Sequence, residues 1–448
     1  MTKRLITFGF LFLSAFTYSQ EKSYSFSLEE AVTFALDSNY TALNARRDIA
    51  KAIKKKWETT ASGLPQIKAN IGYNNNLKQP VTLIPAEFSG GEPGTFSPVT
   101  FGTKQSANAV ATLEQLIFDG SYLVGLQAAK AFLNYSENAN EKTQLEVRKG
   151  VINAYGSVLL SEELVAIFKK NKETLDKNLF ETRKIYENGL TEEENVEQLE
   201  ITLLDIETNL NNAERMLTIA KQMFNTALGI DINAPVILTE KLDTLAQENI
   251  QLSTLNEGLS LENNIDYKIA YNLTEQRSLE MKLEKSRALP RLSAFVNYGT
   301  QANSNSFTFL DSDQIWYQSS VLGVSMNIPL FSSGMRGART QQARIALDQS
   351  KTQLEETVQN IKLQFDSAKS DYQFSIDKYE NAKKNLALAE RIESKNQIKF
   401  TEGLSTSFDL RQAQTQLYTA QQQYFQAMLD VINAKTQLET VLNNTQIK

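Results

Sequence analysis

Residues 186–191 read Tyr-Glu-Asn-Gly-Leu-Thr, and residues 400–405 read Phe-Thr-Glu-Gly-Leu-Ser. The two stretches lie 214 positions apart, and apolar residues follow each of them at alternating spacings of three and four. That spacing is typical of one face of a long helix. Gly120 and Gly334 repeat the same offset, since each precedes the glycine of its stretch by 69 residues. The sequence therefore predicts two copies of one long helical hairpin, which indicates a tandem duplication.

The rest of the chain divides around these hairpins into two structural repeats. We expect the first repeat over 20–230, a connector over 231–254 and the second repeat over 255–448. Each repeat should begin with a helix of about 35 residues, over 28–62 and over 255–288. None of the eight prolines lies inside a long periodic stretch, as helix interiors require.

Each repeat then continues in the same order, with two strands, a long helix and a shorter returning helix. The expected elements are strands over about 64–80 and 105–118 with helices over 120–188 and 192–228, and then strands over about 289–303 and 317–331 with helices over 334–402 and 406–443. At 1.5 Å per residue, each long helix would span roughly 100 Å, far more than a globular domain. The repeats differ in length chiefly between the two strands, where surface loops tolerate insertion.

The strand segments alternate apolar and polar residues; Ile67, Ala69, Ile71 and Tyr73, for example, share one face. This pattern suits the wall of a membrane β-barrel, and a soluble sheet with one buried face would show it too. We expect six aromatic residues near segment ends to form a membrane-interface girdle: Tyr73, Phe118, Tyr298, Trp316, Tyr317 and Phe331. Bacterial barrels start at about eight strands, so a chain with four must pool strands with other copies, and three copies would supply about twelve.

The composition excludes most catalytic chemistry. The chain contains no histidine and no cysteine, so it has no imidazole base, no thiolate nucleophile and no metal site built on either residue. We therefore expect neither an enzyme nor a cofactor. The net charge of −6 also disfavours a nucleic-acid partner, because phosphate binding needs a concentrated positive surface.

The first nineteen residues have the pattern of an export signal. Lys3 and Arg4 precede an apolar run over 5–16, and small residues follow it before Gln20. The sequence thus predicts a secretory signal peptide over 1–19 that is removed from the mature protein. No later apolar run reaches the roughly 18 residues that a membrane-spanning helix needs, so we expect no such helix.

The order of these features resembles the TolC family of outer-membrane efflux and secretion channels. The matching motifs are the Leu-Pro steps at 64–65 and 289–290, Ile328-Pro329-Leu330-Phe331 before Gly334, the two Gly-Leu-Thr/Ser tips, and Phe408-Asp409-Leu410 after the second tip. The similarity covers essentially the whole chain after residue 19. It implies a mainly α, TolC-like fold with a pair of β-hairpins in each chain.

The resemblance also implies an assembly and a function. Long helices from a homotrimer would form a coiled-coil barrel, and four strands from each protomer would form a 12-stranded transmembrane β-barrel. The protein would lie in outer-membrane lipid and extend into the periplasm. It would be the passive exit duct of a tripartite efflux or type I secretion system, with a periplasmic adaptor protein and an inner-membrane transporter as partners. The alternative is a structural or adhesive periplasmic coiled coil with a soluble β cap.

The hairpin tips are the first candidate site. Each tip glycine permits a left-handed backbone that ends the preceding helix, and an apolar residue follows it at an exposed turn. In the family this turn meets the adaptor; a simple helix stop, with leucine closing the hairpin, is the other interpretation. The candidate docking residues are Gly189, Leu190 and Thr191 in the first tip and Gly403, Leu404 and Ser405 in the second.

Acidic residues beside the tips form the second candidate site. Thr191 and Glu194 have the spacing of a capping box, with Thr191 capping and Glu194 reaching back. The resemblance places Asp409 where an acidic residue rings the periplasmic entrance of family members. The next acidic position of the family is Gln412 here, so Glu194 or Glu197 could supply a second carboxylate. Alternatively, Asp409 is a first-turn acid stabilised by the helix dipole.

Overall fold

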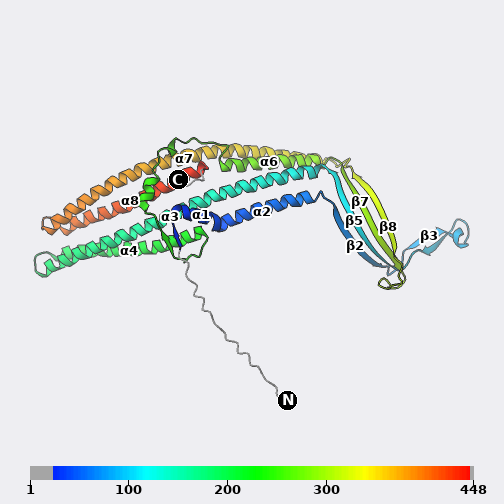
Figure 1. Cartoon of the computed structure of the whole chain (residues 1–448), viewed down its shortest axis with the longest axis horizontal. Coiled ribbons are helices and arrows are strands. Elements are labelled where there is room, and N and C mark those ends of the chain that lie inside the picture. The colour runs from blue at the N-terminus through cyan, green and yellow to red at the C-terminus, as the bar shows by residue number, and fades with distance from the viewer. Residues whose placement is uncertain (1–23, 444–448) are drawn as a thin grey trace, which may run out of the picture. The chain divides into compact units, whose positions relative to one another are not determined.

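The structure is a computed structural model that describes residues 24–443 (Figure 1). The signal peptide expected over 1–19 lies outside these residues. The first half contains β1 (Tyr24–Phe26), α1 (Leu28–Ser38), α2 (Tyr40–Ala61), β2 (Gln66–Asn75), β3 (Val81–Pro85), the 3-10 helix η1 (Ala86–Ser89), β4 (Phe96–Thr100), β5 (Gln105–Asp119), α3 (Gly120–Glu187) and α4 (Glu193–Leu228). The second half contains β6 (Val236–Leu238), α5 (Leu242–Glu248), the 3-10 helix η2 (Thr254–Asn256), α6 (Ile265–Ser286), β7 (Arg291–Ser304), β8 (Tyr317–Asn327), α7 (Met335–Thr401) and α8 (Ser407–Val441).

The chain forms two compact units, which are described separately. We call the first the helical unit; its described residues are 24–44, 142–264 and 361–443. The second is the sheet unit, with residues 45–141 and 265–360. Both long helices, α3 and α7, contribute residues to each unit.

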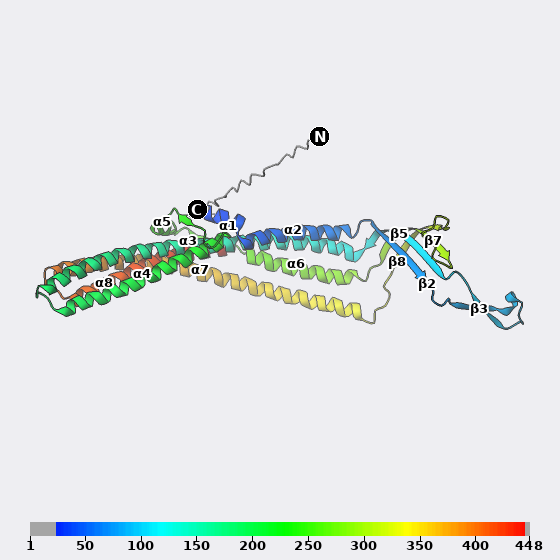
Figure 2. The ribbon, with the colours of Figure 1, turned by 90° about the horizontal axis from the view of Figure 1, so that it is seen from below.

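The sheet unit holds a four-stranded antiparallel sheet in the order β2-β5-β7-β8 (Figure 2). Its register aligns one mainly apolar face across the strands, as in the rows Ile67–Leu113–Val296–Leu322 and Phe118–Leu292–Met326. Most of this face is uncovered by the described residues, since Ile71 is 83% exposed and Leu322 is 77% exposed. The opposite face is mainly polar or small, with rows such as Asn70–Val110–Gly299–Ser319. The alternation expected from the sequence is therefore present, and Phe309 covers the apolar face only at Ala107 and Ala302 among the described residues.

The helical unit is built around a core shared by α1, α3, α4, α5, α7 and α8. Tyr155, Phe224 and Val431 are fully buried in it, and the rings of Tyr155 and Phe224 meet edge to face at 5.7 Å. Strands β1 and β6 pair in parallel, which ties the start of the described chain to the connector. Smaller apolar clusters continue toward the tips, one between α3 and α4 and another between α7 and α8.

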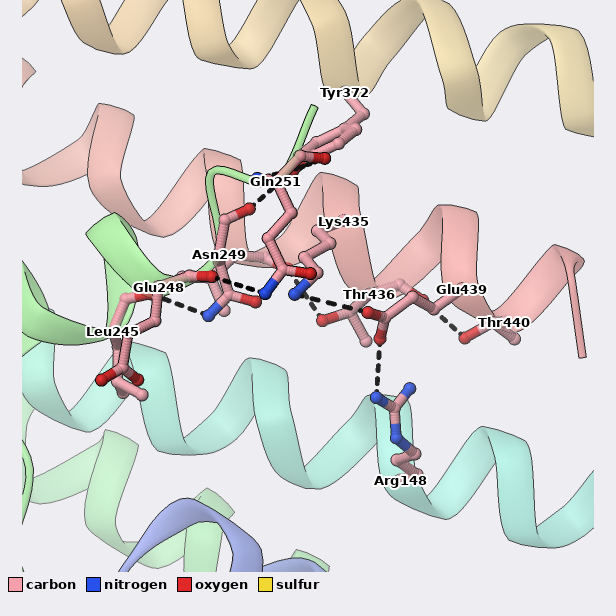
Figure 3. A network of polar contacts seen from close by, with 11 residues as sticks. Arg148, Leu245, Glu248, Asn249, Gln251, Tyr372, Lys435, Thr436, Glu439 and Thr440 are labelled. Atoms are coloured by element: carbon pink, nitrogen blue, oxygen red, sulfur yellow. Dashed lines mark hydrogen bonds and ion pairs between the residues drawn. The ribbon is translucent and has the colours of Figure 1, made fainter. Parts of the chain in front are cut away.

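Two groups of polar contacts lie within the helical unit: a buried ionic cluster joins α3 to α8, and hydrogen bonds join α7 to the connector (Figure 3). Arg148 Nη2 of α3 lies 2.6 Å from Glu439 Oε2 of α8, and Lys435 Nζ lies 3.5 Å from the other carboxylate oxygen. The three side chains are nearly inaccessible to solvent. Beside them, the Tyr372 hydroxyl of α7 donates a hydrogen bond to the Asn249 carbonyl at 2.6 Å and accepts one from the Gln251 N–H at 2.9 Å.

Two expected helices differ from the structure. The helix expected over 28–62 is interrupted at Asn39, whose φ of −59° and ψ of 135° are not helical. The Asn39 side chain accepts hydrogen bonds from the N–H groups of Thr41 and Ala42 and donates one to the Ala227 carbonyl, so it caps α2 and anchors the break to α4. The helix expected over 255–288 begins only at Ile265.

Several further elements were not expected from the sequence, among them β1 and the two 3-10 helices. The connector contains β6 and α5, and the insertion between β2 and β5 contains the antiparallel pair β3–β4.

By length and composition, one described helix, α3, could cross a membrane, because it has an 18-residue window of mean hydropathy 1.4. Half of that window is buried, as in a core helix, so it is weak evidence for a span.

Candidate functional site

The two hairpin tips have the same backbone closure. Gly189 and Gly403 both have a φ of 72°, in the left-handed region that favours glycine. In the first tip the Leu190 N–H donates to the Ile185 carbonyl at 3.1 Å; in the second, the Leu404 N–H donates to the Lys399 carbonyl at 2.8 Å. These bonds satisfy the last carbonyl groups of α3 and α7. The repeated glycine thus has the structural role expected for it.

The leucine beside each tip glycine points into solvent. Leu190 is 78% exposed and Leu404 is 73% exposed. Neither side chain is buried within its hairpin in the single chain, and a docking role for the tips stays a prediction. Two large apolar side chains at neighbouring exposed turns are available to a partner.

The helices that return from the tips are capped differently. At the second tip, Thr406 caps α8 in a full capping box with Asp409. The capping box expected at the first tip is wrong, because α4 begins one residue later than its Thr191 cap requires. Its N-cap is Glu192, which makes no side-chain capping bond, and the Thr191 hydroxyl accepts a hydrogen bond from the Asn195 side-chain amide at 3.0 Å.

Neutral polar contacts join the first tip to the second within the helical unit. The Ser407 N–H and hydroxyl donate to Asn195 Oδ1 at 3.3 and 2.5 Å. Farther from the tips, Asn178 and Gln397 exchange two hydrogen bonds at 3.0 and 3.1 Å. Asn171, seven residues before Asn178, donates to the Gln421 side chain at 3.0 Å.

These amide contacts were not predicted from the sequence. Asn171 and Asn178 both lie on α3 and are almost fully buried. A polar residue repeated at heptad spacing in an apolar seam is known to fix the register of packed helices. That spacing is the signal that could have identified them. Ser407 and Asn195, by contrast, lie 212 residues apart and had no sequence signal.

The tips enclose a cleft of about 480 Å³. Side chains from both tips line it, including Ile185 and Leu190 from the first and Phe400 and Thr406 from the second. The cleft therefore combines apolar and hydrogen-bonding groups, and of the two exposed leucines Leu190 lines it.

Asp409 uses one oxygen of its carboxylate for capping. Oδ2 accepts hydrogen bonds from the Thr406 hydroxyl at 2.8 Å, the Ser405 hydroxyl at 3.1 Å and the Thr406 N–H at 3.2 Å. These hydrogen bonds favour the ionised carboxylate and hold the pKa of Asp409 below its ordinary value of 3.8. The two bonds from Thr406 are the largest cause. Oδ1 accepts no hydrogen bond from the described residues, and the side chain is exposed. One carboxylate can therefore cap α8 and still present negative charge to solvent.

The other gate candidates are not joined to Asp409 in the single chain. Gln412, Glu194 and Glu197 are all exposed. Within residues 24–443, no hydrogen bond or ion pair links any of them to Asp409. A shared ring of these groups stays a prediction.

The aromatic candidates of the sheet unit are only partly grouped. The Tyr73 ring lies 5.6 Å from Phe307 and 5.7 Å from Phe309, and Phe309 lies 6.5 Å from Trp316. Phe309 is buried against Ala107 and Ala302 on the apolar face. An aromatic cluster therefore marks the end of the sheet from which the β2–β5 and β7–β8 loops emerge, and its two phenylalanines were missed because they lie in a loop.

The other aromatic candidates do not join this cluster among the described residues, and the membrane-interface girdle stays a prediction. Tyr298 lies in the middle of β7, because that strand continues to Ser304. Tyr317 pairs with Gln301 and so belongs to the polar face of the sheet. Phe118 follows an irregularity in β5 and pairs with Leu292 of the apolar face, and Phe331 is highly exposed beyond the end of β8.

The sequence matches the family of outer membrane efflux proteins over residues 35–230 and again over 258–444. The chain belongs to this family. The match thus falls once in each half of this efflux protein, and the TolC-like resemblance drawn from its tips and Leu-Pro steps is confirmed. It is an outer-membrane protein with a TolC-like fold.

Individual relatives agree with this membership. The outer membrane protein TolC of Vibrio cholerae is 21% identical over 408 residues, covering 91% of this efflux protein and 87% of the relative. The alkaline protease secretion protein AprF of Pseudomonas aeruginosa is 21% identical over 350 residues, with 73% and 67% covered. The crystal structure of the Campylobacter jejuni CmeC outer membrane channel superposes with a TM-score of 0.73 at 15% identity, covering 93% and 86% of the two chains.

Proposed function

We infer that this chain is the outer-membrane exit duct of a tripartite efflux or type I secretion system. The duct would be passive: an inner-membrane transporter would supply the energy for export, and a periplasmic adaptor would connect that transporter to the duct. Family membership supports an efflux channel rather than an enzyme. The observation on which the inference rests is the four-stranded sheet: among residues 24–443 most of its apolar face is uncovered and its two edge strands have no outer partner.

The sheet edges favour closure by copies of the same chain. Strands β2 and β8 each have a partner on one side only. Unpaired backbone groups are not tolerated in lipid, so these edges must find partners. With four strands in alternating directions, β2 and β8 run antiparallel to each other. The β8 edge of one copy can therefore pair with the β2 edge of the next, and three copies would close a barrel of about twelve strands.

Helix α4 also has an uncovered apolar surface. The exposed residues form a broken stripe at helical spacing: Ile201, Leu204, Met216, Ile219 and Met223. Burying apolar surface contributes about 25 cal/mol per Å², so a neighbouring copy packed on this stripe would stabilise an assembly. The homotrimer thus has support from both units.

The first prediction tests the duct itself. The protein without residues 1–19, extracted in detergent, should behave as a trimer in size-exclusion chromatography with light scattering. Reconstituted into planar bilayers, it should give single-channel conductance steps. A chain that is monomeric and soluble without detergent would instead support the soluble coiled-coil alternative, and the duct inference would be wrong.

We further propose that the hairpin tips dock the periplasmic adaptor. The exposed Leu190 and Leu404, the repeated geometry of the two glycine turns and the cleft between the tips support this proposal. An adaptor segment that enters the cleft would cover Leu190, and one that also reaches the second turn would cover Leu404; burial of each leucine would stabilise the complex by about 1.5–3 kcal/mol.

The second prediction tests this docking. Replacing Leu190 and Leu404 together with aspartate should weaken binding of the cognate adaptor to the detergent-solubilised trimer by about tenfold or more for each leucine. Conductance in the absence of adaptor should not change. Asn188→Asp with Ser394→Asp is the matched control, since it adds the same charge at exposed positions that do not line the cleft and removes no apolar side chain. Equal loss of binding in the control would show that charge, not leucine burial, governs docking.

A further inference from the structure

The β3–β4 hairpin has one face that none of residues 24–443 covers. The register pairs Leu83 with Pro98 and Pro85 with Phe96, so these four residues share that face with Val81. Leu83 is 64% exposed, and the others are exposed as well. On the opposite face, Ile84, Ser97 and Val99 are half-buried, and Ser97 contacts Ser89 of η1 through their hydroxyls at 2.9 Å.

Such a hairpin needs a cover. Two strands alone are marginally stable in water, and an apolar face must pack against something to hold them. Neither strand contains a charged residue; the charges of the insertion, on Lys78, Glu87, Glu92 and Lys104, lie at its base and its turn. Prolines at the end of β3 and within β4 disfavour the addition of a further strand. The cover should therefore be an uncharged, apolar surface that packs on the face of the hairpin.

The position of the hairpin in the sheet unit argues against lipid as the cover. Strand β3 begins eight residues after Tyr73, on the far side of the aromatic cluster of Tyr73, Phe307, Phe309 and Trp316. Aromatic girdles of membrane barrels lie at the level of the lipid headgroups. Figures 1 and 2 both show the hairpin projecting beyond the end of the sheet. It thus lies past the hydrocarbon layer, where the available cover is protein.

The nearest such protein is a second copy of this chain. The hairpin continues from β2, which is one edge of the sheet, and β8 is the other edge. Because β2 and β8 run antiparallel, the end of β2 and the start of β8 lie at the same end of the sheet. Joining copies edge to edge therefore places the hairpin beside the residues that lead into β8 of the next copy. Leu310, Ile315 and Tyr317 are exposed there, with Ile315 at 63%.

We propose that the bare face of the β3–β4 hairpin packs against the apolar side chains of Leu310, Ile315 and Tyr317 in the next copy and fastens neighbouring copies together outside the membrane. The exposed Asp311 and Asp313 of the same segment would stay in solvent beside this contact. This proposal rests on the trimeric duct inferred above. It gives the long insertion of the first repeat a role that the shorter β7–β8 loop does not have. It also accounts for two apolar surfaces that the single chain leaves bare.

Cysteine cross-linking tests the proposal directly, because the chain has no cysteine of its own. The trimer with Leu83→Cys and Ile315→Cys in each chain, treated with a short bismaleimide, should give dimer and trimer bands on a denaturing gel. A link within one chain would leave only the monomer band. Thr82→Cys with Ile315→Cys is the matched control, since Thr82 is exposed on the opposite face of the same strand, and its ladder should be lost.

A second pair of variants measures the contact without cross-linking. Leu83→Glu should lower the temperature at which the trimer dissociates, whereas Thr82→Glu should leave that temperature unchanged. Measuring the oligomeric size and the conductance of every variant distinguishes a failure of the hairpin contact from a failure of the trimeric duct. A conducting trimer that gives no cross-linked bands with Leu83→Cys and Ile315→Cys, and no lower dissociation temperature with Leu83→Glu, overturns the hairpin proposal alone. A chain that forms no trimer overturns the duct and the hairpin proposal together.

Discussion

Replacing Glu439 with alanine is expected to lower the free energy of unfolding by about 3–5 kcal/mol. The Glu439 carboxylate contacts both Arg148 and Lys435, and all three side chains are nearly inaccessible to solvent. Its removal leaves two cations in a buried site without the anion between them. Denaturant unfolding of the detergent-solubilised protein, followed by loss of helical circular dichroism, measures the change.

An exposed ion pair provides the control for this prediction. Lys169 of α3 and Glu214 of α4 also join two helices, at 3.0 Å, but both side chains are about half exposed. Glu214→Ala should cost no more than about 1 kcal/mol. A third variant removes the whole cluster, with Arg148→Met, Lys435→Met and Glu439→Leu. It should recover most of the stability, because an apolar replacement leaves no buried charge. If Glu439→Ala and Glu214→Ala cost the same, burial of the cluster has no energetic consequence.

The long elements could be predicted because their signals are local and repeated. Gly120 begins α3, and Gly189 and Gly403 adopt the left-handed backbone of the turns, as the duplicated spacing indicated. Four strands were visible from alternation alone. In each case the information lies within a window of a few tens of residues, where periodicity is the primary signal.

The elements that escaped prediction depend on distant partners. Asn39 reads as one more polar residue in a helical pattern, yet its side chain bonds to Ala227, 188 residues away, and ends α1. Asn195 was missed in the same way, since its contact with Ser407 exists only when two tips meet. The same Asn195 side chain donates to the Thr191 hydroxyl, which does not cap α4. Candidate sites built from sequence therefore identified the tips but not the amides that join them.

Replacing Asp409 with asparagine is expected to weaken block of the reconstituted channel by multivalent cations by about tenfold, because three copies would place three carboxylates around one entrance. The structure shows that capping and gating do not compete for this group. Oδ2 accepts every recorded hydrogen bond of the carboxylate, and the side chain as a whole is exposed. Planar-bilayer recordings with cations added on the tip side measure the block.

The lowered pKa of Asp409 sets the pH dependence of this block. Thr406 is the main cause, so the carboxylate stays ionised below its ordinary pKa of 3.8. Cation block and the capping contribution should therefore persist as pH falls toward 4 and disappear only below the folded-state pKa. Thr406→Ala removes the hydroxyl donor and should return the pKa toward its ordinary value, so that block at pH 4 weakens while block at pH 7 does not.

A variant of Glu402, an exposed acid in the turn of the same tip, tests whether the block depends on a ring of Asp409 carboxylates or on the total charge of the tip. Glu402→Gln should leave the block nearly unchanged, because no capping bond orients that side chain among the described residues. Equal weakening by Glu402→Gln and Asp409→Asn would mean that the tip attracts cations through its total charge. Asp409 would then be only a helix cap, and the entrance ring would have to be sought elsewhere on the tips.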